Sequence, residues 1–226
     1  MKTRLVLAIS FFAISVLNAQ YLSRPLGNFN ALIAAGDVDV LLVKSDTNQL
    51  KIKEFQGIQI SEIITELDGG VLKISTKIDT KNKVKAMVEL HYNNIYSIYS
   101  NSGAKVYTID TIRHDNFELK STGNGQIDVP VVTRYMDMSA TTGGLIVLSG
   151  RAQNGLVNAA TNSRISAFNF TFENVMLSAN TKGLIKINVL KKVEGSASTG
   201  GVINYTGNPS STLSSSLGGK VSNSVD

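Results

Sequence analysis

The second half of the chain is built on an internal repeat of about 19 residues. Seven short segments each combine small or turn-forming residues with a final β-branched residue. They are SGAKV (102–106), GNGQI (123–127), TGGLI (142–146), TNSRI (161–165), TKGLI (181–185), TGGVI (199–203) and LGGKV (217–221). Their β-branched residues are spaced by 21, 19, 19, 20, 18 and 18 residues. A repeat of this length indicates a solenoid, in which each repeat buries its apolar face against the next.

The positions just before each β-branched residue predict a tight corner. Three residues before it, six of the seven repeats have Gly or Asn, the residues that tolerate a positive φ; Lys182 is the exception. Two and six residues before it, every repeat has Gly, Ala or Ser. A phosphate-binding loop would need such glycines once, whereas a solenoid needs them at every turn. The Gly pairs, such as Gly143 and Gly144, are therefore interpreted as architectural.

Strands are predicted on both sides of each corner, because apolar and polar residues alternate there with a period of two. A meander of hairpins and a parallel coil would both give two bends per 19 residues. The second bend of most repeats carries an apolar residue, which a hairpin tip would expose and a coil would bury. These residues are Ile112, Val132, Ala152, Phe170 with Phe172, and Leu190. The pattern favours the coil.

The segment 29–92 has alternating stretches at 37–43, 49–55, 71–77 and 85–91 but no recognisable Gly corner. It is expected to form strands joined by hairpins and to cap the open end of the solenoid. No segment predicts a helix. The expected fold is all-β: a single-stranded, right-handed parallel β-helix-like solenoid with rungs of about 19 residues and an N-terminal β cap.

The first 19 residues have the form of a secretory signal peptide: Lys2 and Arg4, then a mostly apolar core of 13 residues (5–17), then Ala19 at a cleavage point. The remaining chain divides into a lead-in (20–28), the cap region (29–92) and the repeats (93–226), the last two forming one continuous domain, 29–226. No later stretch is long and apolar enough to predict a transmembrane helix. The expected location is outside the cytoplasm, in the periplasm or at the cell surface.

The amino-acid composition excludes several kinds of site and partner. The chain has no cysteine, which excludes disulfides, thiolate metal sites and cysteine nucleophiles. Loss of Lys2 and Arg4 with the signal peptide leaves 20 basic and 17 acidic side chains, a net charge of +3. The basic residues are scattered and form no stripe with interleaved aromatics, so a nucleic-acid partner is not expected.

Glu118 and Asp137 are the strongest candidates for chemistry, because both lie nine residues before a β-branched residue on consecutive repeats. In a parallel coil they would stack about 5 Å apart along the axis. Such a pair could serve a retaining glycosidase or contribute to a calcium site. The alternative is two solvated charges offset by Lys120, and the neighbouring rungs offer only Ser97 and Leu156 at that position.

Aromatic residues between 91 and 107 are the second candidate. The alternation predicts that Tyr96 points inward and that Tyr99 and Tyr107 point outward. Outward tyrosines could stack on sugar rings or cover the junction between cap and solenoid, and the second interpretation is preferred. His91 and His114 lack the spacing of a metal pair and are interpreted as surface or loop residues. No catalytic, cofactor-binding or metal-binding residue is predicted.

The order of these motifs resembles one known family. The stretch from 29 to 43, the DGGVLKI segment at 68–74, the repeated corners and the closing GGVINYTGNP at 200–209 resemble the bacterial family named putative auto-transporter adhesin, head GIN domain. Asn162 with Ser163, and Lys182, depart from the usual glycines. The resemblance covers about 26–226 and implies an exported all-β solenoid of the Bacteroidetes-type envelope, with no catalytic residue to transfer.

The predicted function is a non-enzymatic, exported cell-envelope module for adhesion or binding, whose partner is a polysaccharide or an envelope protein. One alternative is a carbohydrate-active enzyme that uses Glu118 and Asp137. Another is a structural envelope protein that associates with itself as a homo-oligomer.

Overall fold

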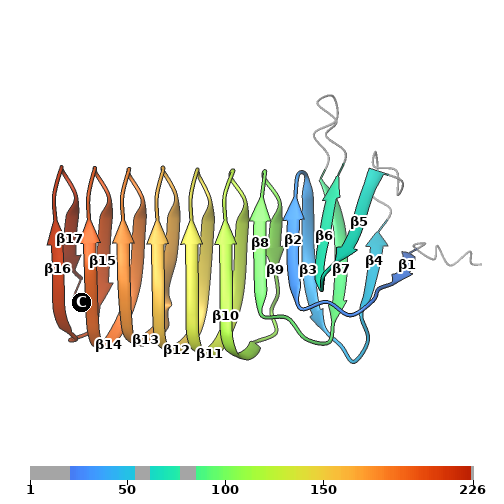
Figure 1. Ribbon diagram of the computed structural model, residues 1–226, viewed down its shortest axis with the longest axis horizontal. Coiled ribbons are helices and arrows are strands. Elements are labelled where there is room, and N and C mark those ends of the chain that lie inside the picture. The colour runs from blue at the N-terminus through green and yellow to red at the C-terminus, as the bar shows by residue number, and fades with distance from the viewer. Residues whose placement is uncertain (1–20, 54–61, 77–84, 225–226) are drawn as a thin grey trace, which may run out of the picture.

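The computed structural model describes residues 21–53, 62–76 and 85–224, and they form a β-solenoid (Figure 1). The described residues contain no α-helix and therefore none that could cross a membrane. The predicted signal peptide, 1–19, lies outside the described residues. The all-β solenoid is confirmed.

Long bent strands make the body of the solenoid, and each one runs from one corner almost to the next. They are β10 (Ile112–Ser121), β11 (Gln126–Ala140), β12 (Leu145–Ala159), β13 (Arg164–Ala179) and β14 (Leu184–Ala197). The last rungs use shorter strands: β15 (Val202–Thr206), β16 (Ser210–Ser215) and β17 (Lys220–Asn223).

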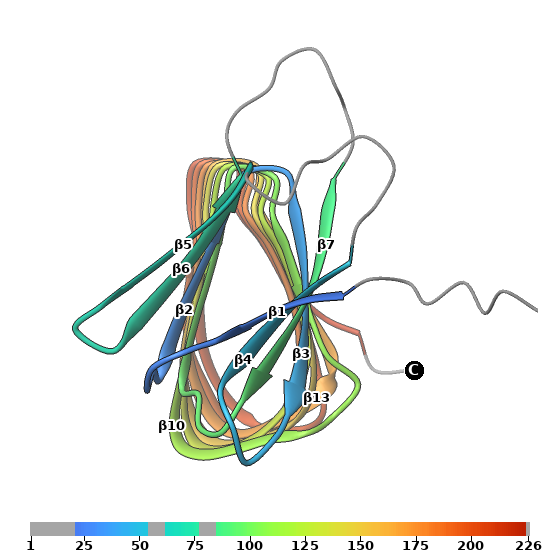
Figure 2. The ribbon, with the colours of Figure 1, turned by 90° about the vertical axis from the view of Figure 1, so that its right-hand side faces the viewer.

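All these strands pair in parallel with the rung before or after them. Ile127 lies opposite Val106 on one side and Ile146 on the other, so the β-branched residues of successive repeats stack in register. This register confirms the parallel coil and rules out the meander of hairpins. The bent strands enclose one elongated core, seen down the axis in Figure 2.

The corners are turns with two left-handed residues in a row. At the corner between β11 and β12, Thr142 has φ +48° and Gly143 has φ +76°. The N–H of Gly144 donates to the carbonyl of Thr141 at 2.9 Å, as in a type I′ turn. The N–H of Gly143 donates to the carbonyl of Thr161 in the next corner at 3.0 Å. The corners are therefore hydrogen-bonded to one another along the axis.

Close stacking explains why the residue after the turn is small. A Cβ on Gly144 would collide with the carbonyl of Ser121 in the preceding rung, and Gly183, Gly201 and Gly219 meet the same obstacle. Ser163 is accommodated because its hydroxyl donates to the carbonyl of Ala140 at 2.7 Å. Lys182 has the left-handed conformation that its corner requires, with φ +62°.

The interior is filled by stacks of identical or similar residues. Ile127, Ile146, Ile165, Ile185 and Ile203 form one stack, and each has 0% of its surface exposed. Burying each side chain contributes roughly 1.5–3 kcal/mol. The predicted second-bend residues Ile112, Ala152, Phe170 and Phe172 are buried, but the predictions for Val132 and Leu190 are wrong. Their neighbours Val131 and Val189 point inward instead, because the alternation of buried and outward residues continues unbroken from Ile127 to Val131 and from Ile185 to Val189.

The N-terminal segment contributes rungs of its own, so the prediction that 29–92 lacks a Gly corner is wrong. β2 (Ala31–Ala35) pairs in parallel with β8 (Ser97–Asn101), and β3 (Val38–Lys44) pairs in parallel with β9 (Lys105–Tyr107). Gly36, with φ +82°, forms the corner between β2 and β3.

The order of rungs along the axis therefore differs from the order along the chain. On their other sides, β2 and β3 pair in parallel with β6 (Val71–Thr76) and β7 (Ala86–Tyr92). The chain makes the β2–β3 rung, moves outward to β6 and β7, and returns past it to β8 (Figure 1).

Antiparallel strands occur only at this end of the part of the chain that the structure describes. Hairpins were expected between the predicted strands, but β3 and β4 (Gln49–Lys53) pair with other strands, and the hairpin that forms joins β6 to β5 (Ile63–Asp68), a strand that the sequence did not predict. In addition, β4 pairs antiparallel with both β7 and β1 (Tyr21–Pro25). Figure 2 shows these strands crossing the end of the coil.

Candidate functional site

The two predicted carboxylates lie side by side on the outer surface of adjacent strands. Glu118 of β10 is in direct register with Asp137 of β11. Lys120 forms an ion pair with Glu118, and the Ser97 hydroxyl donates to Glu118 Oε2 at 2.9 Å. The predicted stacking and the offset by Lys120 are both confirmed.

These neighbours shift the two carboxyl groups in opposite directions. The hydrogen bond from Lys120 lowers the pKa of Glu118, helped by Ser97, although burial acts the other way. Burial raises the pKa of Asp137, and the adjacent Glu118 charge raises it further while Lys120 opposes. The ion pair with Lys120 makes Glu118 a stable anion and a poor proton donor.

Tyr99 and Tyr107 lie on different faces, so the structure does not gather all four candidate residues. Tyr99 is next to Lys120 and therefore near the carboxylates, with Ile33 of β2 on its other side. Tyr107 lies between Leu41 of β3 and Asp128, and the Lys105 ammonium is 5.1 Å from its ring. Both face outward and lie where β8 and β9 meet the N-terminal rung, which supports the junction interpretation.

The prediction for Tyr96 is wrong: its side chain is 37% exposed, and Ile95 fills the interior in its place. Tyr96 instead lies against His114, with the two ring centroids 5.3 Å apart. The segment before β8 shifts the alternation by one residue, which turns Ile95 inward. His91 lies at the end of β7, with Nε2 3.7 Å from Glu89 Oε2.

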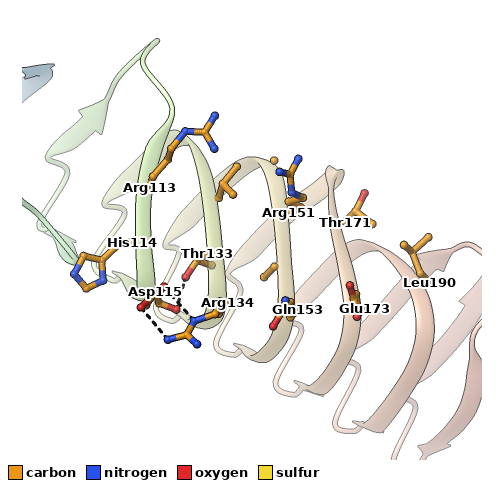
Figure 3. A pocket seen from close by; sticks show the side chains of 13 residues that line it. Arg113, His114, Asp115, Thr133, Arg134, Arg151, Gln153, Thr171, Glu173 and Leu190 are labelled. Carbon is orange, nitrogen blue, oxygen red and sulfur yellow. Dashed lines mark hydrogen bonds and ion pairs between the residues drawn. The ribbon is translucent and has the colours of Figure 1, made fainter.

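A groove that the sequence did not indicate runs along the second bend of the rungs. Its volume is about 760 Å³, and residues of consecutive strands from β10 to β14 line it. Figure 3 shows its polar side chains in two rows, which follow the axis of the solenoid. Neither Glu118 nor Asp137 lines this groove.

The first row, which we call the arginine row, consists of Arg113, Val132, Arg151 and Thr171. These four residues stand in direct register on consecutive strands. Arg113 and Arg151 are exposed and make no ion pair or hydrogen bond within the described residues. They are two rungs apart, which corresponds to about 10 Å along the axis.

The second row, which we call the paired row, consists of Asp115, Arg134, Gln153 and Glu173. Arg134 binds the Asp115 carboxylate with two hydrogen bonds of 3.1 and 2.8 Å. Glu173 accepts a 2.7 Å hydrogen bond from Lys191 of the next rung. The charges of this row are therefore neutralised within the protein, and those of the arginine row are not.

Between the rows, buried residues form the floor of the groove. Thr133 is buried, and its hydroxyl lies 3.0 Å from the carbonyl oxygens of both Asp115 and Tyr135. Ala152 is buried beside it. His114 lies at one end of the groove and exposed Leu190 at the other. The floor offers shape and apolar contact, and the rows offer charge and hydrogen bonds.

The spacing of two arginines is the one trace of this groove in the sequence, and by itself it does not predict a site. Arg113 and Arg151 are 38 residues apart, which is two repeats, and each is next to a second-bend residue, Ile112 and Ala152 respectively. The bend varies in length between repeats, so counting from the corner does not place these residues reliably. Within the described residues, no group of three or more His, Cys, Asp or Glu side chains could hold a metal ion.

Comparison with known proteins gives a family and a fold. The model of the family described as putative auto-transporter adhesin, head GIN domain matches residues 28–209. A crystal structure of a putative adhesin from Bacteroides fragilis superposes with a TM-score of 0.81 at 20% identity, covering 91% of this chain and 98% of that one.

Two structures from Parabacteroides distasonis share the fold. A putative adhesin gives a TM-score of 0.72 at 16% identity, covering 90% of this chain and 96% of the other. A putative lipid binding protein gives a TM-score of 0.61 at 17% identity, covering 91% of this chain and 97% of the other. No curated protein matches the chain.

Proposed function

Because the chain belongs to the putative auto-transporter adhesin, head GIN domain family, we propose that it is an exported, non-catalytic binding module of the cell envelope. Its partner is an extended one, a polymer or an envelope protein, held along the side of the solenoid. The family implies an adhesion-like role outside the cytoplasm, and the groove gives that role a surface.

The observation that carries this proposal is the axial groove with its two rows of polar side chains. Repeated strands place similar contacts at regular intervals, which suits a ligand that is itself extended. The floor consists of buried residues, so only the exposed side chains of the two rows must be ordered when a ligand enters.

The enzyme alternative is weaker because of the surroundings of the carboxylates. Glu118 is held by Lys120 and Ser97, and the pair lies on the outer surface of strands rather than in the groove. A retaining glycosidase needs one carboxyl that donates a proton and one that attacks. Asp137, with its raised pKa, could be the first, but Glu118 would have to leave its ion pair to act as the second.

The test is binding of the purified protein to an array of neutral and charged glycans, envelope polymers and envelope proteins. We expect saturable binding to at least one of them, unchanged in Glu118→Gln, with no shortening of the bound polymer over time. Shortening that Glu118→Gln abolishes would establish the enzyme instead. An empty array together with a mass above that of the monomer in light scattering would favour self-association.

A further inference from the structure

We infer that the groove binds an acidic polysaccharide, whose carboxylate groups pair with Arg113 and Arg151. This inference rests on the proposed function and specifies the class of its ligand. The two guanidinium groups are the reason for choosing an anion. A guanidinium presents several N–H donors in a plane that matches a carboxylate, and neither group is engaged within the described residues.

The geometry of the arginine row favours a repeating ligand over a single small anion. Val132 separates Arg113 from Arg151 by one rung on each side, so the two guanidinium groups extend from backbone positions two rungs apart. About 10 Å between them suits a chain that carries an acid group at intervals. The paired row has its charges neutralised internally and does not repel such a chain.

A second, smaller hollow continues the arginine row beyond the groove with another basic residue. Arg113 also lines this smaller hollow, together with Lys44 and Tyr92. The Lys44 ammonium donates to the Asn93 carbonyl and lies 5.7 Å from the Tyr92 ring, and no carboxylate pairs with it within the described residues. Arg151, Arg113 and Lys44 thus follow one another along the surface and can serve successive acid groups of one chain.

Polysaccharide is favoured over polypeptide by the uncharged groups of the groove. Gln153 and Thr171 offer an amide and a hydroxyl at the rims, which can bond to sugar hydroxyls. The groove also has small and apolar residues, including Gly150, Ala152 and, at one end, Leu190, and His114 beside Tyr96 gives an aromatic surface at the other end. Sugar rings combine hydroxyl edges with apolar faces and fit such a mixture.

The test compares three polymers of similar length by titration calorimetry: polygalacturonate, its methyl-esterified form and poly-L-glutamate. The esterified polymer keeps the sugar backbone and loses the charge, whereas poly-L-glutamate keeps the carboxylates on a peptide backbone. We expect polygalacturonate to bind best, with an affinity that falls as NaCl rises. Arg113→Ala and Arg151→Ala should each weaken it about tenfold.

Arg164→Ala is the matched control, because Arg164 is exposed on β13, outside the groove, and has no ion-pair partner within the described residues. It should leave binding unchanged. Equal binding of the esterified polymer, with no effect of the groove variants, would overturn the inference and leave the proposed function standing. Stronger binding of poly-L-glutamate would overturn the polysaccharide assignment. Failure to bind any of the three polymers would also overturn it, and only an empty full array would remove the proposed function as well.

Discussion

At the scale of the residue, the same kind of side chain has different roles according to its neighbours. Glu118 and Asp137 occupy equivalent positions on adjacent rungs, yet Lys120 stabilises the charge of one, and burial disfavours the charge of the other. Arg134 is engaged by Asp115, whereas Arg113 and Arg151 are not engaged. The binding proposed above therefore uses the arginine row rather than the carboxylates.

The carboxylate pair gives a prediction with opposite signs for its two members. Because the folded-state pKa of Asp137 is raised, its charged form opposes folding, and Asp137→Asn should stabilise the protein at pH 7 by about 0.5 kcal/mol. Because the folded-state pKa of Glu118 is lowered, its charged form supports folding. Glu118→Gln should therefore destabilise the protein by a similar amount. Thermal unfolding at pH 7 measures both effects.

Both effects should shrink as the pH falls, because protonation of the two carboxyl groups in the folded and unfolded chains removes the charges that cause them. The penalty from Asp137 appears as the pH rises through its folded pKa. The stability that the Glu118 charge contributes is lost as the pH falls through the folded pKa of Glu118. A stability change of the same sign in both variants would contradict this account.

Lys182 gives a second prediction at this scale. It has φ +62° at a corner position where most repeats have Gly or Asn, and a left-handed conformation costs a non-glycine residue roughly 1–2 kcal/mol. Lys182→Gly should therefore raise the free energy of unfolding by up to about 1 kcal/mol. Lys220→Gly is the control: Lys220 lies in a strand without a positive φ, and its replacement should lower stability in the same urea titration.

At the scale of the element, the corner and the second bend follow different rules. The corner repeats because its backbone leaves no choice: two left-handed residues are followed by one that abuts the preceding rung. The second bend makes no such demand, so its length and residues vary from rung to rung. That freedom is what allows it to carry the groove.

Two glycines separate the steric demand of the corner from its conformational demand. Gly103 has φ +86° with no atom within 4 Å of an added Cβ, whereas Gly144 has no positive φ but its Cβ would strike the Ser121 carbonyl. Gly103→Ala should cost about 1 kcal/mol of conformational strain. Gly144→Ala should cost about 2–3 kcal/mol, because two rungs must move apart.

Urea denaturation of the two glycine variants measures this difference. A cost for Gly144→Ala no greater than that for Gly103→Ala would show that the rungs can separate without penalty. In that case the small residues of the corner would need another explanation.

At the scale of the whole molecule, the solenoid has two different ends. One end carries the antiparallel strands β1, β4 and β5, and the other shows β16 and β17, whose side chains are mostly exposed (Figure 1). Within the described residues, β16 and β17 pair with a preceding rung and with no later one. Stability should therefore be lowest toward β17.

Two leucines of one stack test this gradient. Leu177 is 1% exposed within the coil, and Leu213, which occupies the same position two rungs later, is only partly buried. Leu177→Ala should cost about 2–5 kcal/mol, and Leu213→Ala about 1 kcal/mol. Equal losses in chemical denaturation would mean that the end rung is as well packed as the interior.

The sequence by itself determined the coil, its rung length and its corners, because the steric demands of a corner act on residues next to one another and recur at every turn. It also placed Glu118 opposite Asp137, since both are counted from the same corner. Only the tertiary structure decided the position of the β2–β3 rung, whose neighbours come from distant parts of the chain. The groove was decided in the same way, because Arg113 and Arg151 align two rungs apart along a bend whose length varies and whose register is set by pairing between strands rather than by spacing along the chain.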